Sequence, residues 1–472
     1  MRDALKSLHL PGYGLYLGFT AMARLVPLPV MFVLGQGLGT LGYFLLRKRR
    51  KLAVANIRIA LGLDEPDSRE LARRHFATLG ANLLAMLKTA TMSDTQLWRH
   101  ITFAIAPEIA GSPDHKGCVA VLSHTSNWEL LGRLAGLFPR HQFGAIYQKL
   151  ANARVNRHFN ESRARQGVVL FDRQEGFWNA VSFLESGGVL GVLADQYAGV
   201  SGTWMPFFGR LTSTSTLAAA LARRVGVEVV PVVINTTGLA RWHVVIGSPL
   251  MPGNTPDLAT AAINRELERQ ITACPADWLW SHDRWKTPRF GFLLSASNRR
   301  VFFPPAFDRS QLKPYRILVR SVDDPAEARL TVPAVRAIKR GRPDAHVTVV
   351  AVESLAELWR SVEEVDEVVA FSQDESPWDV AKMIARSGRF EVGILLPDTL
   401  RPAGEMFLAG VPYRLGPPGR FPLSFWRNAP GLADPEPAGA ERYRRILAAA
   451  GAANAFPSNP GSPTALAEPD SM

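Results

Sequence analysis

The chain has 472 residues, more than one average domain holds, so we expect two or three domains. Its composition, 47% hydrophobic and 20% charged, is that of an ordinary globular protein. The net charge of +12 suits an anionic partner such as a nucleic acid, an anionic membrane or a phosphorylated lipid. No zinc-finger spacing, recognition-helix pattern or basic run interleaved with aromatic residues is found, so we expect no nucleic-acid partner. Two cysteines, Cys118 and Cys274, provide no basis for a disulfide framework or a cysteine metal site.

The first 50 residues are typical of a membrane-associated segment. Residues 27–46 carry no charge, and a helix of that length, at about 1.5 Å per residue, would cover roughly 30 Å. The prolines and glycines in this stretch leave two alternatives, a helix that spans the membrane and a hairpin or helix that lies in its interface. The basic run RKRRK at residues 47–51 predicts that this end lies on the cytoplasmic side.

The same segment contains GQGLGTLG, residues 35–42, which imitates a dinucleotide-binding fingerprint. No strand precedes it and no strand–helix–strand unit surrounds it. We therefore expect these small residues to serve close helix packing instead.

Farther along, residues 51–100 have apolar positions at helical spacing. From residue 118 to about 288, short β-branched runs alternate with helical stretches, which predicts an α/β domain with a largely parallel sheet. A connector and a second α/β segment follow, and the end of the chain, rich in Ala, Pro and Gly, predicts disorder. The expected parts are a membrane-associated segment over 1–50, an α/β domain over 51–300, a second α/β domain over 301–425 and a disordered tail over 426–472.

The stretch VAVLSHTSNWELLG, residues 119–132, places a histidine directly after an apolar run and a carboxylate five positions later. Five helical steps of about 100° each separate His124 from Glu129, so the two do not share a helix face. They meet only if His124 lies in the turn after a strand and Glu129 in the first turns of the next helix. Glu129 would then hold the imidazole in one tautomer, and His124 would accept a proton from a hydroxyl. The alternative is a plain strand–turn–helix in which His124 caps the turn and Glu129 is solvated.

This stretch closely resembles the histidine, four residues, acidic residue motif of the bacterial lipid A biosynthesis acyltransferases, in its Asn-Trp-Glu form. Further stretches resemble other blocks of that family in the same order: NIRIALG, IYQKLANARVNRHFNESRARQG, the Asp-Gln, Pro-Phe-Phe-Gly and Val-Val-Pro blocks within residues 187–234, and PADWLWSHDRWKTP. The resemblance covers roughly residues 15–290. It implies a glycerolipid-acyltransferase-like α/β domain behind an N-terminal membrane-associated helix, on the cytoplasmic face of the bacterial inner membrane.

The resemblance also implies the chemistry. His124, supported by Glu129, would act as general base on a hydroxyl of a lipid A precursor or related phosphorylated glycolipid. The hydroxyl would attack the thioester of a fatty acyl chain carried on acyl carrier protein, the donor substrate. No intermediate on the enzyme and no cofactor are required, and Ser123 and Ser126 lack a nucleophile-elbow context.

Other residues receive roles from the same resemblance. Arg173 is a candidate donor to the tetrahedral oxyanion, with an ordinary surface arginine as the alternative. Asp195 and Gln196, at a strand end, are expected to shape the site or the acceptor pocket. The alternative is that the two residues only form a turn. Asn127 of the motif is counted with the substrate-binding residues.

Two basic residues are candidates for contacts with phosphate. Lys149 and Arg210 would hold an acceptor phosphate or the phosphopantetheine of the carrier, because arginine in particular suits bidentate phosphate contacts. Basic residues are common in a basic chain, which is the simpler explanation for both. The histidines have no metal-ligand spacing, so we expect no metal, and His282 in WLWSHDRW is expected to order the end of the domain.

Residues 315–420 resemble the N-terminal half of heptosyltransferase-type glycosyltransferases, which implies a Rossmann-like half-domain of the GT-B type. The family's Gly-Asp pair falls here on Ala326 and Glu327, and the sequence stops before the half that should bind the sugar nucleotide. We therefore expect an acceptor-binding or vestigial module, with an inert fused domain as the alternative.

Three functions remain open at this point. The first is an acyltransferase of the lipid A type. The second is an acyltransferase on another glycolipid or on a lysophospholipid. The third is a non-catalytic scaffold that binds glycolipid.

Overall fold

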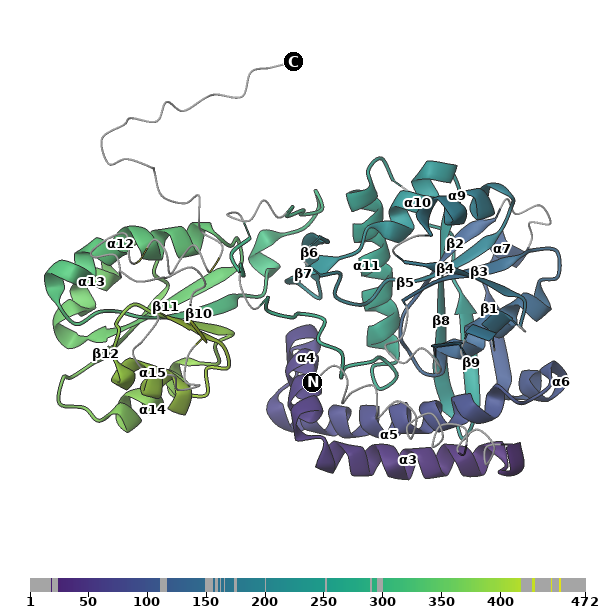
Figure 1. Cartoon of the computed structure of the whole chain (residues 1–472), viewed down its shortest axis with the longest axis horizontal. Coiled ribbons are helices and arrows are strands. Elements are labelled where there is room, and N and C mark those ends of the chain that lie inside the picture. The colour runs from purple at the N-terminus through teal and green to yellow at the C-terminus, as the bar shows by residue number, and fades with distance from the viewer. Residues whose placement is uncertain are drawn as a thin grey trace, which may run out of the picture. The chain divides into compact units, whose positions relative to one another are not determined.

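The computed structural model describes residues 24–110, 117–148, 166–173, 176–199, 201–250, 253–288, 291–294 and 300–416, together with isolated positions outside these ranges. The chain divides into two compact units. Unit 1 comprises residues 1–286 and 302–309, and unit 2 comprises residues 287–301 and 310–472. Figure 1 shows a largely parallel sheet with helices around it in each unit. The predicted α/β class is confirmed.

Unit 1 is built on a seven-stranded sheet in the order β1-β9-β8-β2-β5-β3-β4. Five of its strands run in parallel, and the β8–β9 hairpin reverses the direction, so that β9 and β1 run opposite to the rest. The strands are β1 Ile101–Ile105, β2 Cys118–Leu122, β3 Phe143–Tyr147, β4 Val168–Asp172, β5 Val189–Leu193, β8 Glu228–Gly238 and β9 Arg241–Ile246. A separate hairpin is formed by β6 Thr203–Phe207 and β7 Arg210–Thr214.

The central strands of this sheet are apolar on both faces because helices cover them. The runs CVAVL in β2 and VLGVL in β5 show no polar alternation. The helices of unit 1 are α3 Leu28–Leu45, α4 Arg47–Leu61, α5 Glu65–Thr89, α6 Asp94–Leu97, α7 Pro107–Ala110, α9 Phe177–Glu185, α10 Leu217–Val225 and α11 Pro256–Ala273, with a 3₁₀ helix, η2, at Trp128–Leu137. Caps fix the starts of the long helices: Asp64 accepts from the backbone N–H of Asp67 at α5, and Thr255 accepts from that of Leu258 at α11.

Helix α3 lies along α5 (Figure 1). It is the one described helix that is long and apolar enough to cross a membrane, judged by length and composition. Its contact with α5 is backbone against backbone: a Cβ atom at Gly35 would clash with the carbonyl of Gly80, and one at Gly39 with the carbonyl of Phe76. Gly35 and Gly39 of GQGLGTLG thus serve close helix packing, as predicted.

The connector between the two domains, residues 287–309, is shared: its first part belongs to unit 2 and its second part to unit 1. Residues 287–301 belong to unit 2, where the N–H of Leu293 donates to the carbonyl of Ala450 and Arg342 donates to that of Phe292. Residues 302–309 belong to unit 1, where the N–H of Phe302 donates to the carbonyl of Trp204. The boundary predicted at residue 300 falls inside this divided connector, where hydrogen bonds tie Leu293 into unit 2 and Phe302 into unit 1.

Unit 2 is a six-stranded parallel sheet in the order β12-β11-β10-β13-β14-β15. Its strands are β10 Tyr315–Arg320, β11 Ala345–Val352, β12 Glu367–Phe371, β13 Val392–Leu395, β14 Arg414–Gly416 and β15 Arg427–Asn428, and its helices are α12 Pro325–Arg340, α13 Ala356–Arg360, α14 Pro377–Ser387 and α15 Leu400–Leu408. Within residues 426–472, expected to form a disordered tail, β15 pairs with β14, and Tyr443 and Ala450 are buried in the core. The rest of that segment lies outside the described residues.

The glycine contacts between α3 and α5 generate a stability prediction. Replacing Gly39 by alanine inserts a methyl group against the Phe76 carbonyl and should lower the free energy of unfolding by about 1–3 kcal/mol. Gly37→Ala is the matched control, because a Cβ atom there meets no atom within 4 Å and alanine favours the helix by about 0.5–1 kcal/mol. Thermal unfolding of both variants in one detergent, followed by circular dichroism, measures the difference. Equal melting temperatures would contradict the packing.

Candidate functional site

The predicted motif begins in a sharp turn at the carboxyl end of β2. The closing segment of unit 1 holds this turn along its backbone: the N–H of Leu279 donates to the carbonyl of His124 at 3.0 Å, and the N–H of Ser126 donates to that of Asp277 at 3.0 Å. Ser126 has a φ of 50°, which a serine adopts only where its surroundings impose it. The backbone around His124 is therefore fixed by the sheet on one side and by residues 277–279 on the other.

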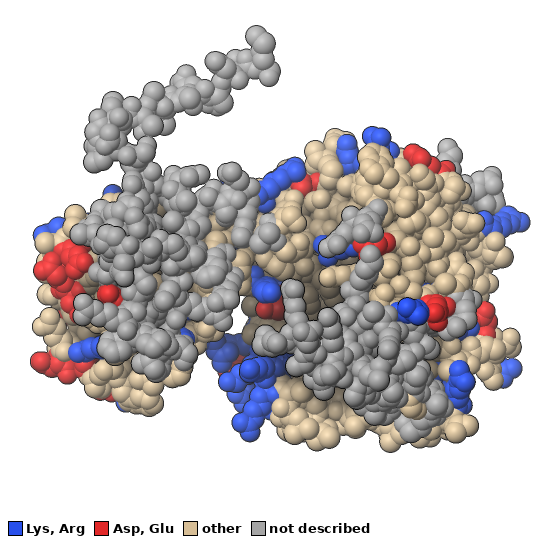
Figure 2. Space-filling view, viewed as in Figure 1, with Lys and Arg blue, Asp and Glu red and all other residues tan. Residues whose placement is uncertain are grey.

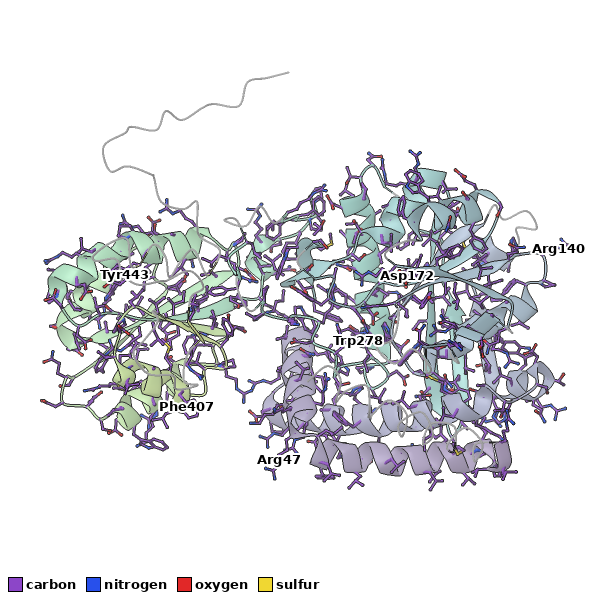
Figure 3. The ribbon with its side chains drawn as sticks, in the orientation of Figure 1. Arg47, Arg140, Asp172, Trp278, Phe407 and Tyr443 are labelled. Carbon is purple, nitrogen blue, oxygen red and sulfur yellow. The ribbon has the colours of Figure 1, made fainter. Side chains whose placement is uncertain are left out.

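The side chain of His124 is held by Asp195, which follows β5, the neighbour of β2 in the sheet. One carboxylate oxygen, Oδ1, lies 2.7 Å from Nδ1 of His124, and the other, Oδ2, accepts the backbone N–H of His124 at 2.8 Å. Oδ2 also accepts the indole N–H of Trp278 at 2.7 Å. Figure 3 marks Trp278 inside unit 1. Asp195 is only 2% exposed, so its charge is balanced by these donors and not by water.

This geometry assigns the tautomer of His124. A carboxylate only accepts hydrogen bonds, so the proton of the neutral ring is assigned to Nδ1, facing Asp195. Nε2 then carries the lone pair, and the amide nitrogen of Gln196 lies 3.2 Å from it as a donor. Trp128 packs edge-on against the ring, with the two ring centroids 5.2 Å apart. The basic nitrogen of His124 therefore points away from Asp195, toward Gln196.

The charges around His124 suit a base that takes up a proton. Burial opposes the protonated imidazole, but the carboxylate of Asp195, aided by that of Glu129, outweighs it and raises the pKa of His124. Burial alone would raise the pKa of Asp195. The contact between Asp195 and His124 outweighs burial, so the pKa of Asp195 is lowered. Asp195 thus stays ionised while His124 gains a proton.

His282 supports the same corner of the site. Burial lowers its pKa to about 4, and its Nε2 accepts the backbone N–H of Tyr197, directly after Gln196. The side chain of Asn56 in α4 donates to the carbonyls of Trp280 and His282. His282 thus links α4, through Asn56, to the turn that carries Asp195 and Gln196.

Glu129 does not hold the imidazole, and the expected contact with His124 is corrected here. Both carboxylate oxygens of Glu129 accept from Arg163, at 2.6 and 3.1 Å. The reason is local: after the turn the chain enters a 3₁₀ helix, η2, and Glu129 in its first turn lies near His124 without contacting Nδ1, which Asp195 occupies. Glu129 acts on His124 through its charge alone.

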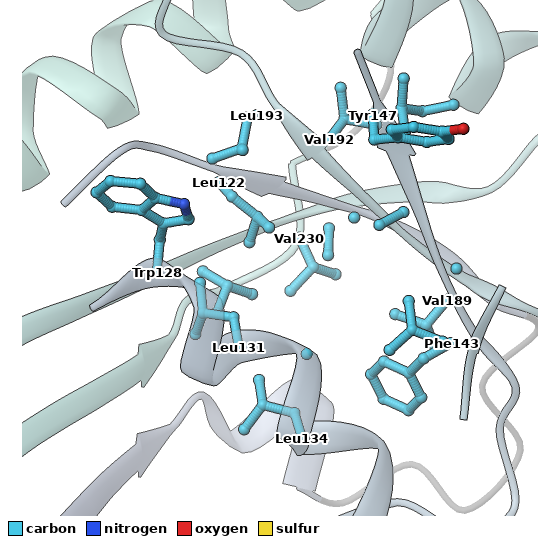
Figure 4. Close-up of a pocket in the computed structure, with 18 of the residues that line it drawn as sticks. Leu122, Trp128, Leu131, Leu134, Phe143, Tyr147, Val189, Val192, Leu193 and Val230 are labelled. Carbon is cyan, nitrogen blue, oxygen red and sulfur yellow. The ribbon is translucent and has the colours of Figure 1, made fainter. Parts of the chain in front are cut away.

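A large apolar cavity opens beside His124. Its volume is about 1260 Å³, above the roughly 300–1,000 Å³ of most small-molecule pockets. His124, Trp128, Glu129, Arg163 and Gln196 lie among its lining residues. From there the cavity extends along one face of the sheet beneath η2, as Figure 4 shows for Leu131 and Leu134 of the helix and Val189 and Val230 of the sheet.

The strand register explains why the cavity is hollow. In one row across the sheet Ala120 of β2 pairs with Gly191 of β5, which pairs in turn with Ala145 of β3. These small side chains leave space under η2. The row at the far end contains Cys118, Val189 and Phe143, which are larger, and the row nearest His124 contains Leu122 and Leu193. The result is an elongated apolar channel with the base at one end.

The other predicted residues lie in different places. Arg173 lines the cavity and is exposed, and its backbone N–H donates to the carbonyl of Tyr147. Asn127 is fully buried, and neither polar atom of its side chain has a partner among the described residues. Arg210 is 5% exposed in the β6–β7 hairpin and is not among the residues lining this cavity, so the expected phosphate contact does not fit its position. Lys149 lies outside the described residues.

Residue patterns alone missed three members of the site. Trp278 and Arg163 both lie in stretches that resemble family blocks, PADWLW and ESRARQG, but nothing in those stretches names their partners Asp195 and Glu129. Trp128 directly precedes Glu129 in the motif, and an aromatic residue there could have been expected to contact the histidine. Within the described part of the chain, no group of three His, Cys, Asp or Glu side chains is arranged to hold a metal ion.

Comparisons with known proteins identify the family to which unit 1 is related. Residues 1–287 match the family model described as bacterial lipid A biosynthesis acyltransferase. The chain is 25% identical over 271 residues to the lipid A biosynthesis lauroyltransferase of Escherichia coli K12, covering 56% of this chain and 87% of that protein. It is 24% identical over 272 residues to the lipid A biosynthesis palmitoleoyltransferase of the same organism, covering 56% and 88%.

Two solved structures overlap a smaller part of the chain. A family 9 glycosyl transferase from Veillonella parvula has a TM-score of 0.28 at 20% identity, covering 31% of this chain and 44% of that one. The E. coli ADP-heptose heptosyltransferase II has a TM-score of 0.24 at 20% identity, covering 29% and 40%. At these scores the likeness carries no argument about activity. The family match over more than half of the sequence shows that the chain belongs to the bacterial lipid A biosynthesis acyltransferase family and is an acyltransferase.

Proposed function

We propose that the protein transfers a fatty acyl chain from an acyl carrier protein thioester to a hydroxyl of a lipid A precursor, with His124 as general base and Asp195 as its positioning carboxylate. The observation that carries this proposal is the His124–Asp195 contact at the mouth of a long apolar cavity. The names of the relatives support the acceptor class.

The reaction needs one proton acceptor and no enzyme nucleophile. The acceptor hydroxyl takes the place of the Gln196 amide at Nε2 of His124 and gives its proton to this nitrogen as its oxygen bonds to the thioester carbonyl carbon. Asp195 stabilises the imidazolium that forms. When the tetrahedral intermediate collapses, the carbon–sulfur bond breaks and the proton passes from His124 to the leaving thiolate.

The oxyanion of that intermediate needs a hydrogen-bond donor. Gln196 is placed for this role, because its amide nitrogen lies 3.2 Å from Nε2 and is released when the hydroxyl binds there. Arg173, exposed among the cavity-lining residues, is the second candidate and also suits the phosphate of the carrier's prosthetic group. The net charge of +12 favours both an acidic carrier and a phosphorylated acceptor.

A direct assay tests the proposal. Purified protein is incubated with labelled acyl carrier protein thioesters of several chain lengths and a lipid A precursor, and His124→Ala is assayed beside it. We expect transfer by the wild type and a loss of about 10²- to 10⁴-fold in the variant. Other glycolipids and lysophospholipids form separate arms, and transfer only to one of these would replace the acceptor. No transfer to any acceptor would overturn the enzymatic assignment.

The role of Asp195 predicts a change in pH dependence. The base works when neutral, so activity should rise with pH through the raised pKa of His124. Asp195→Asn removes the carboxylate that raises this pKa, so the rising limb should move to lower pH. Its amide also favours the wrong tautomer, which should lower kcat/KM by about 10²- to 10⁴-fold.

Glu129→Gln is the matched comparison for that experiment, because Glu129 raises the same pKa through charge without contacting Nδ1. Its rising limb should move in the same direction but less, with a smaller loss of kcat/KM. If Glu129→Gln had the larger loss and Asp195→Asn left the profile unchanged, Glu129 and not Asp195 would position the base.

The channel predicts which residues set acyl length. Ala120→Leu adds bulk to the small middle row, so the ratio of kcat/KM for shorter over longer acyl chains should rise about 10-fold or more. Ala104→Leu, the same change on an exposed position of edge strand β1, is the control and should leave the ratio unaltered. Competition between acyl donors of different length measures this ratio of kcat/KM values. An unchanged ratio in Ala120→Leu would show that the acyl chain lies elsewhere.

A further inference from the structure

The outer face of α3 is a continuous apolar surface. We define it by the α3 side chains directed away from α5, which are between 47% and 68% exposed: Val30, Val33, Leu34, Leu38, Leu41, Phe44 and Leu45. Scattered exposed leucines are ordinary, but a contiguous set along a whole helix marks an interaction surface.

The opposite face of α3 is fixed to the body of unit 1. The packing of Gly35 and Gly39 on α5 leaves no room for a side chain between the two backbones. Helix α5 in turn is tied to the sheet, because Asn82 bonds to Thr236 of β8 and to Trp242 of β9. It also carries exposed charges at its N-terminal end, such as Arg69 and Arg73. Helix α3 could cross a bilayer only by leaving α5 or by drawing this charged helix in with it, and both are costly.

Basic side chains lie at both ends of the outer face. Beyond its C-terminal end α4 begins with RKRRK, where Arg47, Lys48 and Arg49 are exposed (Figures 2 and 3). At its N-terminal end a second cavity of about 910 Å³ is lined by Arg24, Lys88, Arg99 and His100, and no carboxylate is among its described lining residues. The helix between the two basic groups has 18 residues and is roughly 27 Å long.

We propose that α3 lies in the plane of an anionic phospholipid bilayer, with its outer face in the acyl boundary layer and the basic groups at its two ends on lipid phosphates. The helix does not cross the membrane. An apolar face flanked by cations is the arrangement expected of an interfacial helix, and each basic residue near an anionic surface adds to binding. The proposal is independent of the acyl transfer proposed above and decides between the two alternatives that hydropathy left open.

A depth measurement tests it on the full chain. Single cysteines are introduced at Val30, Leu38 and Leu45 in a background with Cys118→Ala and Cys274→Ser, labelled with an environment-sensitive fluorophore and bound to phosphatidylglycerol vesicles. Quenching by lipids brominated at known depths should give one shallow depth for all three labels. A profile deepest at Leu38, with the end labels on opposite sides, is that of a spanning helix and would overturn the proposal. A label at exposed Trp178 in α9, at the opposite end of unit 1 from α3 (Figure 1), is the control and should not be quenched.

A second measurement tests the two basic ends. Paired substitutions, Arg47→Gln with Lys48→Gln and Arg24→Gln with Arg99→Gln, should each weaken co-sedimentation with phosphatidylglycerol vesicles, by about fivefold for each neutralised residue. Equal binding to neutral phosphatidylcholine vesicles, or no effect of either pair, would overturn the contact with phosphates. Acyl transfer in detergent, assayed on the same variants, should persist, so failure of this proposal is distinct from failure of the enzymatic one.

Discussion

The carboxylate of Asp195 is the interaction on which the site depends. Through two oxygens it accepts the backbone N–H and the imidazole N–H of His124 and the indole N–H of Trp278, and so joins the ends of β2 and β5 to the closing segment of unit 1. A buried carboxylate that lost one of these donors would keep its desolvation cost without compensation. The same contacts that set the tautomer of the base therefore also hold three separate parts of the chain together.

Whether the sequence predicted a feature of this site depends on how far apart in sequence the contacting residues lie. His124 was named from its place after a short apolar strand, and Asp195 and Gln196, also at a strand end, were named from the family resemblance. Which carboxylate contacts the imidazole was not predictable, because it depends on β2 and β5 being neighbours in the sheet although 66 residues lie between Leu122 and Val189. Periodicity reveals strands and not their order, and so the nearer carboxylate, Glu129, was chosen. Arg163, its true partner, likewise comes from a distant segment.

The same limit explains the N-terminal segment and the boundary between the units. Hydropathy finds an apolar helix at α3 but does not distinguish its faces. Which face packs inward depends on the contact with Gly80 of α5, a residue far away in sequence. The small-residue pattern of GQGLGTLG did predict close packing, because glycine spacing is local information. Around residue 300, hydrogen bonds to Ala450 and Trp204 decide which unit each segment joins, and both partners are far away in sequence.

Helix α5 connects the two proposed surfaces of unit 1. One side of it packs on α3, while Leu83 and Met86 on another side line the acyl cavity. Between them, Asn82 lies beside Thr236, and the hydroxyl of Ser126, in the strained turn after His124, donates to the side chain of Asn82 and lies 2.8 Å from that of Thr236. A bilayer that contacts α3 therefore bears on a helix packed against α5, and α5 is hydrogen-bonded to the turn of the base. The proposed reaction, with its acceptor in a membrane and its acyl chain on a soluble carrier, needs the base fixed relative to the bilayer, and α5 is the element that would provide this connection.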